Sequence, residues 1–287
     1  MNVLKQLLLP ALISLATVAN AQVKTEKITK EFTFDKKSTG NVVVVDNIFG
    51  TVAVETHSGD KVLFEVERII KAKTAEGLKK AEELSLEFAD TGDSIVGYLK
   101  APYIQNKRSG RRANVQINGP LGYNFEYNFR IKVPQHTNLA IRTVNDGALK
   151  VSNLTANHIS AHNVNGPITL DNIAAAIDAK TVNGDVQVVY KENPKGESCM
   201  ETLNGNVELL YQDDLSAIIN FSSFNGDFYT DLNDLQKLPV KVEKTTSENG
   251  AKTKYEVDKA SSFKTGGGAA QLNLKTFNGK VIVKSAG

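Results

Sequence analysis

A short phrase centred on an asparagine returns six times along this chain, as in TVNGDV at residues 181–186 and TFNGKV at 276–281. The first four intervals between its asparagines are 20, 18, 21 and 21 residues. Self-similarity at a fixed period near 20 is typical of repeat architectures, in which each repeat is one structural unit stacked on its neighbours. The six asparagines are Asn145, Asn165, Asn183, Asn204, Asn225 and Asn278. The repeat favours a function carried by an extended surface over one carried by a single catalytic pocket.

Each position around the asparagine favours one type of residue in all copies of the repeat. Six and four positions before it, mostly apolar residues alternate with polar ones, which predicts a strand with one buried face. Two positions before it stands a small hydrogen-bonding residue, as in Thr143 and Thr202. After the turn the alternation resumes in pairs such as Val186 and Val188. The residue one position before the asparagine is apolar in every copy: Val144, Val164, Val182, Leu203, Phe224 and Phe277.

The asparagine–glycine pair predicts how these strands connect. Both residues tolerate positive φ, so they turn the chain sharply. In a solenoid each strand pairs with its equivalent one repeat along, and identical side chains stack about 4.8 Å apart. Stacked asparagine amides can then bond one another along the column. We therefore expect an all-β fold, a β-solenoid (β-helix-like) with 18–21 residues per rung; a sandwich of antiparallel hairpins is the main alternative.

Residues 1–21 have the features of a signal peptide. They carry one positive charge (Lys5), an apolar stretch at 7–18 and the small-residue cleavage site Ala19-Asn20-Ala21. The mature chain would begin at Gln22. We therefore expect a secreted protein, periplasmic or at the cell surface or extracellular, with no membrane-spanning segment after signal cleavage.

The composition narrows the function classes. Cys199 is the only cysteine, so an intrachain disulfide is excluded. The formal net charge is +2, a balance that offers no general attraction to nucleic acid. No catalytic, cofactor-binding or metal-binding residue set stands out, and we assign no cofactor. The oligomeric state is not readable from the sequence.

The mature chain divides into two segments. Residues 22–133 form a β-rich segment with one short α-helix, expected from Thr74 to Glu87, which packs on or caps the solenoid. Capping is needed because an exposed solenoid end would template strand addition. Residues 134–287 hold the repeats, with an insertion at about 231–265 that contains a charged hairpin turning at 248–250.

These features resemble a known family. The residues that carry the resemblance are the signal peptide, the VPxxxxL run at 133–139, TVNGDV at 181–186 and TFNGKVIV at 276–283. Together they are similar to the bacterial putative adhesin family, exported β-repeat proteins of unknown function that are common in Bacteroidetes and related to head-like domains of autotransporter adhesins. The resemblance implies a β-repeat fold and a role in adhesion, and it brings no catalytic residues.

One column of oxygen-bearing side chains deserves separate consideration. Asp185, Asn206 and Asp227 stand two residues after their repeat asparagines. On successive rungs, Asp185 and Asp227 would lie about 10 Å apart with Asn206 between them. Such a column could bind Ca²⁺ or act as an inverting carboxylate pair. The simpler interpretation is that they are ordinary turn residues, because neither the EF-hand spacing nor the GGxGxD calcium repeat is present.

Other candidate residues favour structural roles. His158 and His162 lie four apart on one strand, about 13 Å, too far for one metal ion. Cys199 falls in an outward slot and is expected to be a spare thiol. The alternating aromatic run 123–129 is expected to be core that covers one end of the solenoid. The basic run KRSGRR at 107–112 is expected to be a solvated turn rather than an anion-binding patch.

Two functions remain open at this point. The first is a non-enzymatic adhesin, or a binding or structural protein of the cell envelope, whose repeat surface contacts glycans or envelope or host surface proteins. The second is a polysaccharide-active β-helix enzyme, a lyase or hydrolase. The enzyme would need acidic and basic side chains converging on one groove. The outward positions vary from rung to rung and show no such cluster: Lys150, Thr169, Gln187, Glu208, Tyr229 and Ile282. The first function is favoured.

Overall fold

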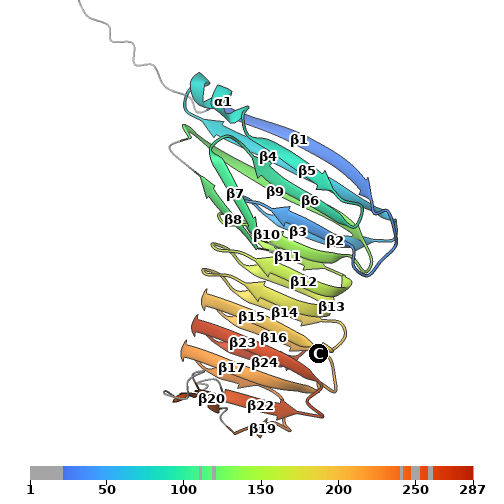
Figure 1. Cartoon of the computed structure of the whole chain (residues 1–287), viewed down its shortest axis with the longest axis vertical. Helices are drawn as coiled ribbons and strands as arrows, with labels where there is room; N and C mark the ends of the chain where they lie inside the picture. Colours follow the sequence, from blue (N-terminus) through green and yellow to red (C-terminus); the bar gives the residue numbers. More distant parts are fainter. Residues whose placement is uncertain are drawn as a thin grey trace, which may run out of the picture.

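The computed structural model of this chain describes residues 22–286 apart from 110–111, 118–120, 240–241, 247–252 and 258–260. Two sheets face each other, and each repeat contributes one strand to each sheet (Figure 1). The first sheet runs in the order β1 (Gln22–Thr33), β4 (Lys61–Ala72), β9 (Tyr123–Pro134), β3 (Val52–His57), β11 (Leu149–Ser152), the first half of β13 (Ile168–Lys180), β14 (Val186–Tyr190), β16 (Val207–Tyr211), β24 (Val281–Ser285) and β18 (Phe228–Thr230).

The second sheet faces the first, and its central strands also pair in parallel. Its order is β5 (Ser85–Asp90), β6 (Ser94–Lys100), β2 (Val42–Asp46), β10 (Asn138–Arg142), β12 (Thr155–His162), the second half of β13, β15 (Glu197–Asn204), β23 (Ala270–Asn278), β17 (Ala217–Asn225), β22 (Ser261–Thr265) and β19 (Gln236–Lys237). Among the described strands of these two sheets, antiparallel pairing is confined to the ends, at β1–β4–β9, β5–β6 and β17–β22–β19. The parallel pairing of equivalent strands confirms the solenoid and rules out a sandwich built from antiparallel hairpins.

The predicted apolar columns form the core between the two sheets. Leu139, Ile159 and Ile177 are buried six positions before their asparagines, and Val186 and Val188 are buried after the turn. The neighbouring positions point outward, as the two-residue period of a strand requires. The core is therefore a stack of similar layers, and its stability comes from apolar burial and backbone pairing.

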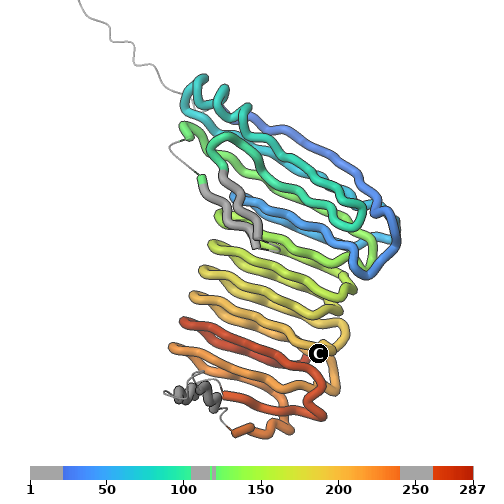
Figure 2. Tube along the Cα trace, in the orientation of Figure 1, coloured from blue at the N-terminus to red at the C-terminus, as the bar shows by residue number. Residues whose placement is uncertain are grey.

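The sixth repeat does not occupy the sixth place in the stack. β23 pairs in parallel with β15 on one side and with β17 on the other, and β24 likewise lies between β16 and β18. Figure 2 shows this C-terminal pair, in red, between two orange strands. The expectation that every strand pairs with the next repeat along the chain is therefore wrong for the fourth copy, whose strands pair with the sixth copy instead of the fifth.

The insertion at 231–265 explains this exchange of order. It leads through β19 and β22, which cover the outer side of β17. Residues 266–269 then cross the start of β17, where Thr265 Oγ1 donates to the Leu215 carbonyl and the Ala270 amide donates to the Ser216 carbonyl. Gly266 and Gly268 take φ values of 53° and 73° in this crossing. The chain thus enters the inner side of β17 and fills the gap beside β15.

The stack continues on its N-terminal side beyond the first asparagine repeat. β2 and β3 pair in parallel with β10 and β11, and Phe49 forms a bridge with Asn145. Their connecting turn holds Asn47, whose buried amide donates to the carbonyl oxygens of Gly50 and Tyr127. The turn at 47–50 is therefore equivalent in position to the asparagine–glycine turns, although its asparagine lies inside.

Long antiparallel strands and one helix complete this N-terminal end. The aromatic run on β9 is buried, as expected, with Tyr127 and Phe129 almost fully covered. Helix α1 spans Ala75–Ala81 with Thr74 as its N-cap, as predicted, but it ends earlier than Glu87 because β5 begins at Ser85. No helix in the described part of the chain is long and apolar enough to cross a membrane.

Two hairpins lie outside the paired sheets. β7 (Ile104–Ser109) pairs with β8 (Arg112–Ile117), and β20 (Val242–Thr246) pairs with β21 (Thr253–Val257), both antiparallel. The second pair agrees with the expected hairpin in the insertion, whose turn at 248–250 lies outside the described residues. Residues 1–21 also lie outside them, as do all the side chains of the KRSGRR run at 107–112.

Candidate binding surface

The six repeat asparagines form one hydrogen-bonded ladder along the edge where their turns stack. Each side-chain Nδ2 donates to the Oδ1 of the asparagine before it in space, at 2.7 or 2.8 Å. The spatial order is Asn145, Asn165, Asn183, Asn204, Asn278 and Asn225. The expected amide stacking is confirmed, and we call this column the asparagine ladder.

The residues beside the ladder fix each turn to its neighbour. Thr181, Thr202 and Thr276 are buried, and the Oγ1 of each donates to a glycine carbonyl of the preceding rung at 2.8–2.9 Å. The glycines are needed because the turns pack so closely. A Cβ on Gly205 would lie 2.1 Å from the Gly184 carbonyl oxygen. The edge is therefore a rigid element with one turn per rung.

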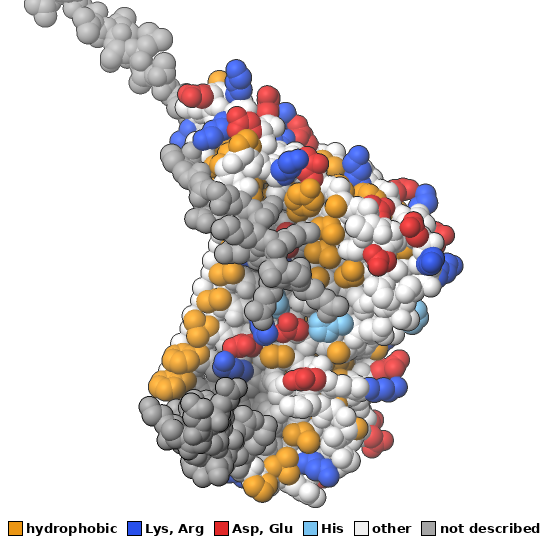
Figure 3. All heavy atoms as spheres, viewed as in Figure 1, with side chains coloured by type: hydrophobic (Ala, Val, Ile, Leu, Met, Phe, Trp, Pro, Cys, Tyr) orange, Lys and Arg blue, Asp and Glu red, His pale blue; other side chains and the backbone are white. Residues whose placement is uncertain are grey.

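A line of apolar side chains, exposed at four of its six positions and partly buried at Val144 and Val164, runs directly beside the ladder. It consists of the residues one position before each asparagine, and we call it the apolar ridge. In spatial order these are Val144, Val164, Val182, Leu203, Phe277 and Phe224. Exposure is 36% at Val182, 45% at Leu203, 42% at Phe277 and 74% at Phe224. In Figure 3, hydrophobic side chains follow the left margin of the repeat stack, where these turns lie.

The two phenylalanines of the ridge form a stacked pair. The ring centroids of Phe224 and Phe277 are 4.8 Å apart, and the ring planes differ by 4°. Phe224 belongs to the last asparagine rung, and no other described aromatic ring packs on it. Phe224 is 74% exposed, so the end of the ridge presents an aromatic ring to solvent.

Sequence reasoning identified the apolar column but did not recognise that it is exposed. The signal was available in the two-residue period of the strand. Positions six, four and two before the asparagine point inward, as Ile177, Ala179 and Thr181 show. The position one before it must then point outward, so Val182 and its equivalents form a surface line.

The acidic column is not arranged as expected. Lys280 lies between Asn206 and Asp227, because β24 is inserted between β16 and β18. The Asp185 carboxylate accepts the Asn206 backbone amide at 2.7 Å, and the Asn206 side chain accepts the Lys280 amide at 2.9 Å. The expected placement of Asp185 and Asp227 two rungs apart is therefore wrong. No group of three His, Cys, Asp or Glu suited to a metal ion occurs among the residues that the structure describes.

The outer face of the second sheet carries an ion-pair cluster that the sequence did not reveal. Asp178 Oδ2 lies 3.0 Å from His162 Nε2, and its Oδ1 lies 2.9 Å from Lys180 Nζ. Hydrogen bonds from His162 and Lys180 hold the pKa of Asp178 well below its usual range. Cys199 stands next to Asp178 in register, and burial raises the pKa of its thiol. A raised thiol pKa disfavours a reactive thiolate.

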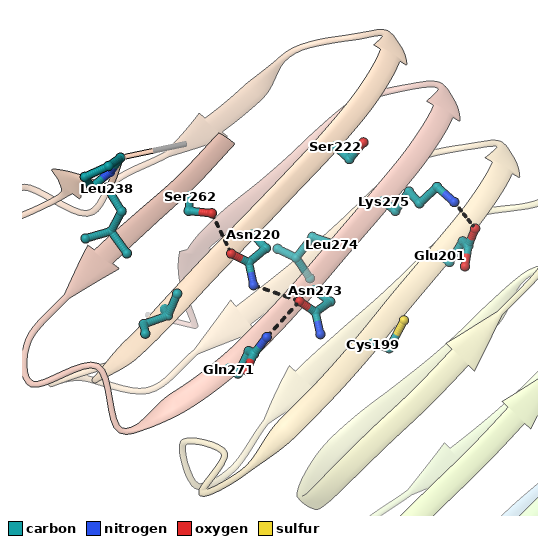
Figure 4. Close-up of a pocket in the computed structure, with 12 residues that line it drawn as sticks. Cys199, Glu201, Asn220, Ser222, Leu238, Ser262, Gln271, Asn273, Leu274 and Lys275 are labelled. Carbon is teal, nitrogen blue, oxygen red and sulfur yellow. Dashed lines mark hydrogen bonds and ion pairs between the residues drawn. The ribbon is translucent and has the colours of Figure 1, made fainter. Parts of the chain in front are cut away.

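A depression of about 430 Å³ lies on the same outer face, over β15, β23, β17 and β22. Figure 4 shows that its polar side chains contact one another. Asn220 donates to Asn273 at 2.8 Å, Ser262 donates to Asn220 at 2.7 Å, and Lys275 is paired with Glu201 at 2.8 Å. The depression offers hydrogen-bonding groups already in use, and its one acidic side chain is neutralised. This arrangement does not favour acid–base catalysis, which needs a free acid or base.

Comparisons with known proteins place the chain in a structural context. A family model described as Toastrack DUF4097 matches residues 35–262. A solved structure of a "putative cell adhesion protein" from Clostridium sporogenes is 13% identical, with a TM-score of 0.35, covering 91% of this chain and 100% of that one. A "putative adhesin" from Bacteroides fragilis is 8% identical, with a TM-score of 0.34, covering 90% and 97%.

A third solved structure, a "putative lipid binding protein" from Parabacteroides distasonis, is 10% identical, with a TM-score of 0.30, covering 93% of this chain and 98% of that one. No curated protein matches the chain. With TM-scores below 0.5, these structural likenesses carry no inference about function.

Proposed function

The chain belongs to the Toastrack DUF4097 family, and on that premise we propose that it is an exported, non-enzymatic binding protein of the cell envelope, adhesin-like in action. Its binding surface is the turn-edge strip, which we define as the asparagine ladder together with the apolar ridge. The proposal includes export because residues 1–21 have the features of a signal peptide.

The observation that carries this proposal is where the exposed apolar side chains lie. Six large apolar side chains are exposed in the described part of the chain, and four of them belong to the ridge. Tyr229 is a fifth and lies on β18, next to the ridge's last rung, whereas Val23 lies at the other end of the molecule on β1. Exposed apolar side chains scattered singly are normal, but a contiguous line marks an interaction surface.

The geometry of the strip suits weak, repeated contacts. Six rungs spaced about 4.8 Å apart give a line of roughly 24 Å. A single line of side chains presents far less than the roughly 800 Å² per partner of a standard protein interface. One strip would therefore bind weakly. Many copies on a cell surface would bind strongly, because linked sites raise the effective concentration.

The test is a binding array of glycans and surface proteins probed with purified residues 22–287. A variant carrying Phe224→Ser and Phe277→Ser removes the aromatic end of the ridge and leaves the ladder. Val23→Ser is the matched control, because it removes an exposed apolar side chain far from the strip. Circular dichroism verifies that all three proteins are folded.

We expect saturable binding of the wild-type protein and of Val23→Ser to the same spots, and loss of binding by the double variant. Equal binding by all three proteins, or no saturable binding to any spot, would overturn the assignment of the strip as the binding surface. Release of oligosaccharides from a spot would overturn the non-enzymatic part of the proposal.

A further inference from the structure

The strip combines two rows with different chemistry, and we propose that this combination recognises an extended, neutral glycan lying along the stack axis. The inference rests on the proposed function and names the ligand class of the same surface. It is carried by the free hydrogen-bonding capacity of the ladder, the apolar ridge beside it and the lack of charge in both rows.

The ladder amides are only half used by the protein. A carboxamide has two N–H donors and two acceptor lone pairs. Within the ladder, Asn183 donates once to Asn165 and accepts once from Asn204. In the described part of the chain its side chain makes no other hydrogen bond, and the amide is exposed. Each interior amide thus keeps one donor and one acceptor for solvent or ligand.

These free groups repeat with the spacing of the rungs. Because the ladder is held by its own hydrogen bonds, its donors and acceptors are fixed before any ligand arrives, which lowers the entropic cost of binding. A polymer whose hydroxyl groups recur at a similar interval can satisfy several amides at once. Sugar chains have such hydroxyl groups on both edges of every residue.

The ridge supplies the second half of the match. A pyranose ring has apolar C–H faces as well as hydroxyl edges, and aromatic rings are suited to contact such faces because their own faces carry partial negative charge. Phe224 offers an exposed aromatic ring at the end of the ridge, supported from behind by Phe277 at 4.8 Å. Leu203 and Val182 continue the apolar row toward the N-terminal end.

The charge pattern disfavours anionic partners. Both rows of the strip consist only of asparagine and apolar residues. The charged side chains nearby are of mixed sign, with Asp185, Lys280 and Asp227 on one flank. The other flank carries Arg142, Lys180, Glu201 and Lys275, where Lys180 is paired with Asp178 and Lys275 with Glu201. Anionic membranes and polyanionic polysaccharides are bound by clustered Lys and Arg, which the strip lacks.

A substitution series separates a sugar-stacking surface from a merely apolar one. Phe224→Leu keeps an apolar side chain but removes the aromatic face, whereas Phe224→Trp enlarges that face. The probes are dextran, mannan and xyloglucan as neutral glycans, heparin and alginate as anionic glycans, vesicles containing phosphatidylglycerol, and fibronectin as a protein. Val23→Ser again serves as the folded control.

We expect binding to at least one neutral glycan, with Phe224→Leu weaker by about three- to tenfold and Phe224→Trp at least as strong as the wild type. Affinity should rise with oligosaccharide length until the chain spans the ladder. Unchanged binding to neutral glycans by Phe224→Leu would overturn the stacking. Ridge-dependent binding only to heparin, alginate, vesicles or fibronectin would overturn the neutral glycan class while leaving the proposed function standing. Binding that never depends on the ridge would overturn both.

Discussion

Asn225 donates a hydrogen bond to Asn278 at 2.8 Å, although 53 residues separate them in the sequence. Asn278 in turn donates to Asn204 at 2.8 Å. The last repeat of the chain therefore joins the fourth repeat to the fifth, and the ladder is continuous only because the C-terminal segment is threaded between them. The fold and the proposed binding surface both depend on this placement of the last repeat between the fourth and the fifth.

Removal of the C-terminal repeat should release the repeat before it. A chain that stops after Ala269 lacks β23 and β24, so β17 and β18 lose their parallel partners on the inner side. We expect rapid hydrogen exchange at residues 217–230 and a lower midpoint of thermal unfolding. A chain that stops after Ser285 keeps both strands and is the control. If residues 217–230 were as well protected from hydrogen exchange as in the full chain, the placement of β23 and β24 beside β17 and β18 would be contradicted.

The ladder should contribute to stability in proportion to the bonds that each member makes. Asn204 makes two ladder bonds and Asn225 makes one. An intramolecular hydrogen bond contributes about 0.5–1.5 kcal/mol net. Asn204→Ala should therefore lower the free energy of unfolding by about 1–2 kcal/mol, and Asn225→Ala by about half as much. Urea denaturation measures both free energies, and equal losses would contradict a contribution in proportion to the number of ladder bonds.

Close packing of the turns makes a sharp prediction for two glycines. Alanine at Gly205 would place its Cβ 2.1 Å from the Gly184 carbonyl oxygen, and that backbone atom cannot move without disturbing the next rung. Gly196 has no atom within 4 Å of the same position. We expect Gly205→Ala to destabilise the protein by at least about 2 kcal/mol and Gly196→Ala to be close to neutral. Similar unfolding midpoints for the two variants would show that the turns are looser than described.

The Asp178 cluster predicts a pH dependence of stability. His162 and then Lys180 lower the pKa of Asp178 in the folded protein, so its contribution to stability is present above the unfolded pKa of about 3.9. That contribution is lost as the pH falls toward the lower folded pKa. Asp178→Asn should cost about 1 kcal/mol at neutral pH, given partial solvent screening, and the cost should shrink as the pH falls through the acid range. Asp214→Asn, outside the cluster, should show no such convergence.

The sequence predicted the rung but not the order of the rungs. The alternation around residues such as Ile177 and Val186 identifies inward positions, and the asparagine column identifies the turns, because both depend on local periodicity. The sequence around each repeat does not indicate which repeats flank β23, because every repeat has similar residues at the equivalent positions. The order depends instead on how residues 266–269 cross the start of β17, a tertiary relationship that the period does not encode.

The candidate surface was predictable only in part. The apolar identity of the ridge was visible in the sequence, and its exposure follows from the two-residue strand period that places Thr181 inside and Val182 outside. The Phe224–Phe277 contact joins the fifth and sixth copies, which are neighbours in either order, whereas only the exchanged order places Phe224 rather than Phe277 at the end of the ridge. The same exchange places Lys280 beside Asn206 and so breaks the acidic column expected from Asp185 and Asp227.

Side-chain amide NMR is the sharpest test of whether the turn-edge strip contacts the ligand. The protein is labelled with ¹⁵N and titrated with the neutral glycan that the array retains most strongly. We expect the Nδ2 resonances of the ladder asparagines to shift together and to saturate at one ligand concentration, with little change at Asn47, which is buried in the N-terminal turn. Shifts confined to the depression near Asn220 and Asn273, with the ladder unperturbed, would contradict contact at the strip.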